Sequence, residues 1–180
     1  FLAFSSIAQV GFILIGISGH SDAAVASAVY FIMVYIFSNL AAFGIISLVS
    51  DVTGKENIDD YKGFYSTNPL LAWVLTIALF SLAGIPPTAG FFGKFFLLMS
   101  GAAADNNTLI IIAALNMIVS LYYYLRVVKA MFMDSNAQPI EKLKPGWMPV
   151  TAYIVCTAGI LLSGIIGGAF EYIISIVSTH

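Results

Sequence analysis

A lysine and two adjacent prolines lie inside one long apolar segment of the chain, between Pro69 and Gly101. A proline inside a helix removes a backbone donor and frees a carbonyl one turn earlier, and in hydrocarbon such groups are satisfied only by protein or trapped water. Pro86 and Pro87 therefore predict a break that lines a cavity. Lys94 would cost roughly 2.5 to 3.5 kcal/mol near the bilayer centre, so it predicts a proton or ion site facing the interior of a helix bundle.

The residues around the prolines suggest how the break is built. Gly84 is suited to end a first half-helix, and Pro87 suits the first turn of a second one, where its missing N–H would be unpaired anyway. Gly90 shares the helical face of Lys94, and small residues mark surfaces packed on neighbouring helices. A second interpretation stays open: Lys94 lies about 10 Å before Gly101, so its stem could extend to the outer surface and have no function.

Other polar side chains fall at a similar depth in neighbouring apolar segments. Ser5 and Ser6 are spaced to share a helical face with Gln9. A second group lies at positions i, i+4 and i+8 of another segment: Asn116, Ser120 and Tyr124. One polar residue in a membrane helix is more often an interhelical hydrogen bond than part of a transport path, so the interpretation depends on several of them surrounding one lysine. The candidates for a hydrated proton path are Ser5, Ser6, Gln9, Asn116, Ser120 and Tyr124. Arg126 and Lys129, further along, are either topology anchors or an inner gate.

The composition indicates what must position these residues. Hydrophobic residues make up 60% of the 180 residues and charged residues 9%, far below the roughly 25% of a soluble domain. The expected fold class is all-α: one polytopic transmembrane helix bundle over residues 1–180, with five membrane segments of which one is discontinuous. The expected segments are 2–18, 24–50, 69–101 with its break near 84–87, 109–133 and 149–167. After Gly168 the chain either continues that helix or bends along the membrane surface.

The basic residues predict an orientation and the chain start predicts a fragment. All Lys and Arg residues except Lys94 lie either within connectors 51–68 and 134–148 (Lys55, Lys62, Lys142 and Lys144) or shortly before the second of them (Arg126 and Lys129), so both connectors are expected to be cytoplasmic. The chain opens at Phe1, inside an apolar run without a charged leader, so we expect the C-terminal piece of a longer subunit rather than a signal peptide.

The sequence also argues against several kinds of site. A net charge of −2 without a basic arm argues against nucleic-acid binding. Cys156 is the one cysteine, which excludes an internal disulfide and a thiolate cluster, and we expect it to be a small buried hydrophobe. No metal site and no cofactor-binding site is predicted in this chain.

Several of these stretches resemble a known family. The run 81–96 is similar to the broken twelfth helix of the antiporter-like subunits of respiratory complex I, the proton-pumping NADH:quinone oxidoreductase, and most closely to the subunit N group. The stretches 2–11, 61–63 and 122–129 are also similar to this family. The resemblance implies the tenth to fourteenth of fourteen helices, with Lys94 as the proton carrier of the outer half-channel. The family often has a histidine where this chain has Gln9, and its other lysine and glutamate belong to the preceding repeat.

The resemblance also implies a function and a setting. The expected function is that of a membrane subunit of a redox-driven proton pump, an oxidoreductase and translocase whose NADH, flavin, iron–sulfur clusters and quinone are bound elsewhere in the complex. Expected partners are the other membrane subunits, the lipid bilayer and protons. The expected location is the bacterial inner membrane, or an organelle inner or thylakoid membrane. Two alternatives stay open: a subunit of a multisubunit cation/proton antiporter, and a structural scaffold whose lysine does not titrate.

Overall fold

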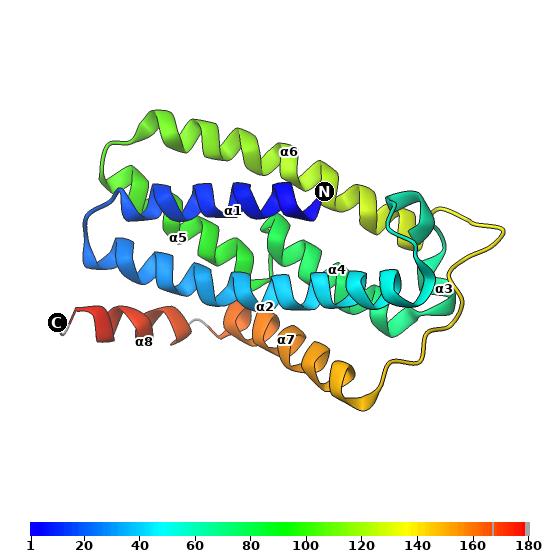
Figure 1. Ribbon diagram of the computed structural model, residues 1–180. Helices are drawn as coiled ribbons and strands as arrows, with labels where there is room; N and C mark the ends of the chain where they lie inside the picture. Colours follow the sequence, from blue (N-terminus) through cyan, green and yellow to red (C-terminus); the bar gives the residue numbers. More distant parts are fainter. Residues whose placement is uncertain (167, 179–180) are drawn as a thin grey trace.

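The computed structural model describes residues 1–166 and 168–178, and this part of the chain consists of helices and connectors without a strand (Figure 1). The expected all-α fold is confirmed. The helices are α1 (Leu2–Ile17), α2 (Asp22–Thr53), the 3₁₀ helix η1 (Ile58–Tyr61), α3 (Phe64–Thr67), α4 (Pro69–Ala83), α5 (Ala89–Ala103), α6 (Asn107–Phe132), α7 (Trp147–Ile165) and α8 (Gly168–Val177).

Three helices in the described part, α2, α6 and α7, are long and apolar enough to cross a membrane. The other apolar helices, α1, α4, α5 and α8, are shorter. The segment expected over 69–101 is two helices joined by residues 84–88. The segment expected over 149–167 ends as α7 at Ile165, and position 167 lies outside the described residues, as do positions 179–180 of the expected domain.

The long helix α2 organises the bundle. It begins after Ser21, whose hydroxyl accepts a hydrogen bond from the Ala24 N–H, and it ends where Gly54 turns into the left-handed conformation at φ 68°. Along its length α2 packs against α1, α4, α5, α7 and α8 (Figure 1). One buried apolar cluster joins α2 to α4, and a second joins α2 to α1 and α5. These contacts bury the end of α4 and the start of α5 on either side of their junction.

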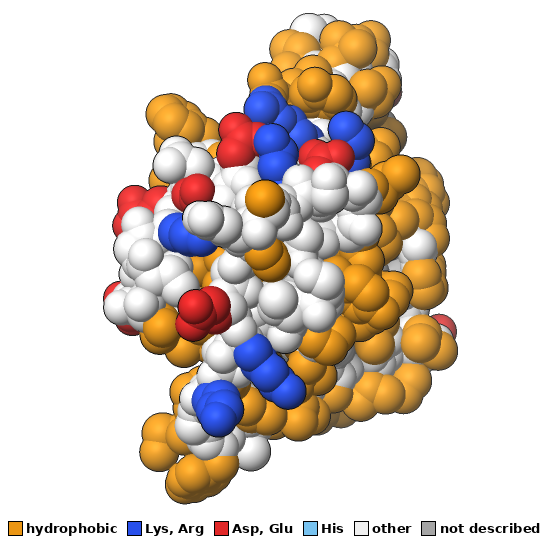
Figure 2. Space-filling model, turned by 90° about the vertical axis from the view of Figure 1, so that its right-hand side faces the viewer, with side chains coloured by type: hydrophobic (Ala, Val, Ile, Leu, Met, Phe, Trp, Pro, Cys, Tyr) orange, Lys and Arg blue, Asp and Glu red, His pale blue; other side chains and the backbone are white. Residues whose placement is uncertain are grey.

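The connectors 54–68 and 133–146 meet at one end of the bundle, which we call the charged end. The Gly63 N–H donates to the Ala130 carbonyl, and the Asn68 side chain is bonded to the backbone of Glu141 and Leu143. Lys, Arg, Asp and Glu side chains gather over this end (Figure 2). The connectors contain η1 and α3, two short helices that apolar periodicity did not predict. The side of the membrane that this end faces stays a prediction.

Exposed ion pairs stabilise the connectors at the charged end. Lys62 and Asp59 are 2.7 Å apart, and this pairing lowers the pKa of the Asp59 carboxyl and raises the pKa of the Lys62 ammonium. Lys129 lies 3.5 Å from Asp134. These are the two ion pairs within residues 1–166 and 168–178, and Lys94 belongs to neither.

Candidate functional site

The junction between α4 and α5 is a tight non-helical turn. Gly84 ends α4 in the left-handed conformation, at φ 83° and ψ 46°, which agrees with the expectation for this glycine. The expectation that Pro87 lies in the first turn of the next helix is wrong. Thr88 is extended and its hydroxyl donates to the Ile85 carbonyl at 2.6 Å, so residues 85–88 form a turn and α5 begins only afterwards. Pro86 and Pro87 are exposed on this turn.

Two glycines allow the backbone to pack closely on either side of the turn. A Cβ atom on Gly90, in the first turn of α5, would overlap the Ser81 carbonyl oxygen in the last turn of α4. A Cβ atom on Gly164 of α7 would lie 2.5 Å from the Pro87 carbonyl oxygen and 2.6 Å from the Ala89 nitrogen. The turn is therefore held between α4 and α7 by contacts that tolerate no side chain.

The end of α4 leaves four carbonyls without a partner inside the helix. Backbone N–H groups of residues 84 and 85 satisfy the first two. The Lys94 ammonium satisfies the other two, because its Nζ lies 2.6 Å from the Leu82 oxygen and 3.4 Å from the Ala83 oxygen. The lysine therefore caps the helix end across the turn, where the helix dipole favours a positive charge.

Lys94 is completely buried and is compensated by neutral groups. Its exposed fraction is 0%, and Nζ lies 4.9 Å from the centroid of the Phe12 ring, within the range of a cation–π interaction. A lysine that extended to the outer surface would carry its ammonium away from α4, whereas here the ammonium points back to the last turn of α4. In the part of the chain that the structure describes, Nζ therefore lies against carbonyl oxygens and a ring and forms no ion pair with a carboxylate.

A hydrogen-bonded chain leads from this helix end toward α6. The Gln9 Nε2 atom of α1 donates to the same Leu82 oxygen at 3.1 Å and to Tyr124 Oη at 3.2 Å. Tyr124 Oη is in turn bonded to the Ser5 hydroxyl. Gln9 and Tyr124 are each 1% exposed. Three of the residues expected to lie near Lys94 are therefore joined to it through one shared carbonyl.

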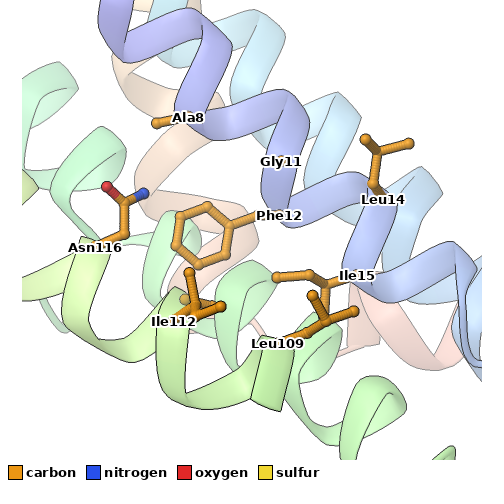
Figure 3. A pocket seen from close by; sticks show the side chains of 9 residues that line it. Ala8, Gly11, Phe12, Leu14, Ile15, Leu109, Ile112 and Asn116 are labelled. Carbon is orange, nitrogen blue, oxygen red and sulfur yellow. The ribbon is translucent and has the colours of Figure 1, made fainter. Parts of the chain in front are cut away.

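The remaining candidates on α1 and α6 lie outside this hydrogen-bonded network. Ser6 donates to the Leu2 carbonyl of its own helix. Neither Ser120 nor Asn116 is hydrogen-bonded to Lys94 in the described part of the chain. Asn116 lines a cavity of about 350 Å³ between α1 and α6, and the Phe12 ring lies beside it in the same cavity (Figure 3). Phe12 therefore touches both the cavity and the lysine.

Arg126 and Lys129 lie near the charged end of α6 and are exposed. The ion pair of Lys129 with Asp134 agrees with an anchoring role at this end. Cys156 is buried and free, as expected of a small hydrophobe. Within the described residues, no group of three or more His, Cys, Asp and Glu side chains could hold a metal ion.

Two features of the site were missed by the sequence reasoning. One is Phe12, which resembles any other core aromatic in the sequence. The other is the hydroxyl pair in which Ser38 of α2 donates to Ser81 of α4 at 2.7 Å, close to the packed turn. A signal for Ser38 existed, since it is a polar residue in an apolar segment, but its partner could not be read from spacing within one helix.

The all-α fold and its long apolar helices are those expected of a membrane protein. The chain belongs to the NADH:quinone oxidoreductase/Mrp antiporter transmembrane family, whose model matches residues 1–120. The resemblance inferred from the sequence is thereby confirmed.

Individual relatives agree with this assignment. NADH-quinone oxidoreductase subunit N of Phocaeicola vulgatus is 47% identical over 172 residues, which cover 95% of this chain and 36% of that protein. NAD(P)H-quinone oxidoreductase subunit 2 of Synechocystis is 39% identical over 189 residues, covering 97% and 36%. A chain of respiratory complex I from Thermus thermophilus with bound Aureothin has a TM-score of 0.79 and 27% identity, covering 93% of this chain and 38% of that one. The chain spans about a third of the length of these relatives.

Proposed function

We propose that this chain is part of a membrane subunit of a redox-driven proton pump, an NADH:quinone oxidoreductase, and that Lys94 carries the proton. The observation that supports this role is the buried Lys94 Nζ, whose partners within residues 1–166 and 168–178 are two carbonyls and a ring. A buried ion pair that loses one partner leaves an uncompensated charge, at a cost of about 3–5 kcal/mol. Lys94 has no such partner, so its deprotonation leaves no buried anion. The site is suited to being charged and neutral in turn.

The proposal assigns roles to the polar residues around the lysine. Gln9, Tyr124 and Ser5 order one side of the path. Gln9 bonds to the Leu82 oxygen that also binds Lys94, Tyr124 bonds to Gln9, and Ser5 bonds to Tyr124. The other members of the path are Ser6, Asn116 and Ser120, with Arg126 and Lys129 at its inner end. In this proposal α4 and α5 form one discontinuous membrane segment, so that it, α1, α2, α6 and α7 are the five segments.

The relatives' names suggest the setting. We assign the chain to a complex with other membrane subunits, in which NADH, flavin, iron–sulfur clusters and quinone are bound elsewhere. Its location would be a bacterial inner membrane, although relatives named as cyanobacterial and chloroplastic subunits make a thylakoid or organelle membrane an alternative. The family description also includes Mrp antiporters, which keeps a cation/proton antiporter subunit as a second candidate. Co-purification with NADH:quinone reductase activity separates the two.

The test is substitution of the lysine in the intact complex. Lys94→Ala should abolish most proton translocation while the complex still assembles. Lys94→Arg should fail as well, because a guanidinium with a pKa above about 12 keeps its charge and does not release the proton. The measurement is the proton-to-electron ratio in proteoliposomes, with Lys62→Ala as a control at an exposed lysine of the charged end. Normal pumping by the arginine variant would contradict the proposal and favour a scaffold with a non-titrating lysine.

A further inference from the structure

The side chain of Gln9 is incompletely satisfied. Its amide nitrogen uses both hydrogens, on the Leu82 carbonyl and on Tyr124 Oη. Its amide oxygen, Oε1, is buried and accepts no hydrogen bond from any residue that the structure describes. A buried carbonyl oxygen without a donor is costly and uncommon, so this atom calls for a partner.

Turning the amide over does not remove the problem. The flip would set Oε1 against the Leu82 oxygen, and both atoms are acceptors. The Leu82 carbonyl therefore fixes the amide orientation, with Oε1 directed away from it. The missing partner must be a donor that reaches Gln9 from another direction.

Lys94 is a donor close by with capacity to spare. Its ammonium has three hydrogens, of which one makes a short bond to Leu82 and one a long bond of 3.4 Å to Ala83. Lys94 Nζ and Gln9 Nε2 share the Leu82 oxygen, so the two side chains meet at one atom. The lysine stem is flexible, because it has four methylene groups and a rotatable ammonium.

We propose that the Lys94 ammonium has two positions, one on the Leu82 and Ala83 carbonyls and one on Gln9 Oε1, and that it moves between them during proton translocation. The inference rests on the function proposed above. Gln9 keeps both of its N–H bonds in either position, so Leu82 retains a donor when the lysine leaves. An amide does not titrate near neutral pH, so Gln9 relocates the proton carrier and does not take the proton itself.

Structures of the intact complex at rest and during NADH-driven turnover test the two positions. The expected result is a class of particles in which Lys94 Nζ lies within hydrogen-bond distance of Gln9 Oε1. The opposite result is Nζ on the Leu82 carbonyl in every class, with a bound water as the partner of Oε1. That result would overturn the inference.

A substitution provides a test that does not depend on resolution. Gln9→Glu keeps the length of the side chain, replaces the donor on Leu82 and Tyr124 by an acceptor, and adds a negative charge beside Lys94, so it should hold the ammonium on the carboxylate and lower proton translocation at least tenfold. Thr157→Val, which removes a hydroxyl bonded only within α7, is the control for a polar loss in a membrane helix. Wild-type pumping by Gln9→Glu, together with failure of Lys94→Ala, would reject the second position and leave the proposed function intact. Wild-type pumping by Lys94→Ala would reject the proposed function itself.

Discussion

Gly90 is where the packing of α4 against α5 can be tested most directly. In Gly90→Ala the added methyl group would overlap the Ser81 carbonyl oxygen and lie 2.6 Å from the Ser81 carbonyl carbon. Both atoms belong to the backbone of α4, so no side-chain rotation relieves the clash. The first turn of α5 must move away from the last turn of α4.

The size of that movement follows from ordinary contact distances. Carbon atoms in contact prefer about 3.5 to 4.0 Å, so the two helices must separate by about 1 Å. Overpacking of this kind costs about 1–3 kcal/mol in the free energy of unfolding. Lys94 lies one turn further along α5, so its Cα moves by about 1 Å relative to the Leu82 carbonyl, and the side chain must re-extend to keep its 2.6 Å bond to that oxygen. Misplacement by that distance costs up to about 100-fold in rate.

The assay is the rate of proton translocation by the assembled complex in proteoliposomes, with thermal dissociation of the subunit measured in parallel. Gly11→Ala is a matched control, because a Cβ atom at Gly11 meets nothing within 4 Å and alanine is favoured over glycine inside a helix by up to about 1 kcal/mol. We expect the control to pump normally. If Gly90→Ala pumps at the rate of the control, close packing of the two helices does not set the position of Lys94.

Replacing Pro86 and Pro87 together by alanine should let residues 84–88 adopt helical conformations, so the proton-to-electron ratio should fall while thermal stability is kept; unchanged pumping would make the turn incidental. Tyr61→Phe removes a buried hydroxyl without a partner and should leave the subunit as stable or up to about 1 kcal/mol more stable in thermal dissociation. Burial raises the pKa of Tyr61 from 10.0 to about 12, so the subunit should lose stability as the pH rises from 10 to 12, and Tyr61→Phe should lose less over that range. Cysteines at positions Lys55 and Lys142 should be protected from an impermeant reagent in oriented cells, and labelling from outside would reverse the orientation.

The features that depend on local sequence were predictable. Gly84 ends α4 because glycine adopts the left-handed conformation. The charge pattern predicted that both charged connectors lie at one end of the bundle, and they do so because the helices they join are antiparallel neighbours. Pro87 was assigned to the wrong place because the turn is prolonged by the Thr88 hydroxyl, a bond that depends on the turn itself.

The polar chain was predictable only in part. The rise per residue predicted Gln9 and Asn116 at about the depth of Lys94, with Tyr124 further inward on the face of Asn116, whereas the structure joins Gln9 and Tyr124 through the Leu82 carbonyl to Lys94. The same rise separates Asn116 from Tyr124 by about 12 Å along α6, too far for one local network. The atom that joins them, the Leu82 carbonyl, belongs to the backbone and has no signature in the sequence.

The capping of α4 by side chains also has a consequence for how the protein is made. The Leu82 carbonyl in its last turn accepts hydrogen bonds from Lys94, which follows α4 in the chain, and from Gln9, which precedes it. If α1 and α4 are membrane segments, as proposed above, α1 is made first and its Gln9 amide is available to the Leu82 carbonyl as soon as α4 follows. Lys94 is made later and adds its hydrogen bonds to the Leu82 and Ala83 carbonyls. The order of the helices along the chain therefore spares the nascent half-helix from leaving the Leu82 carbonyl unpaired in lipid.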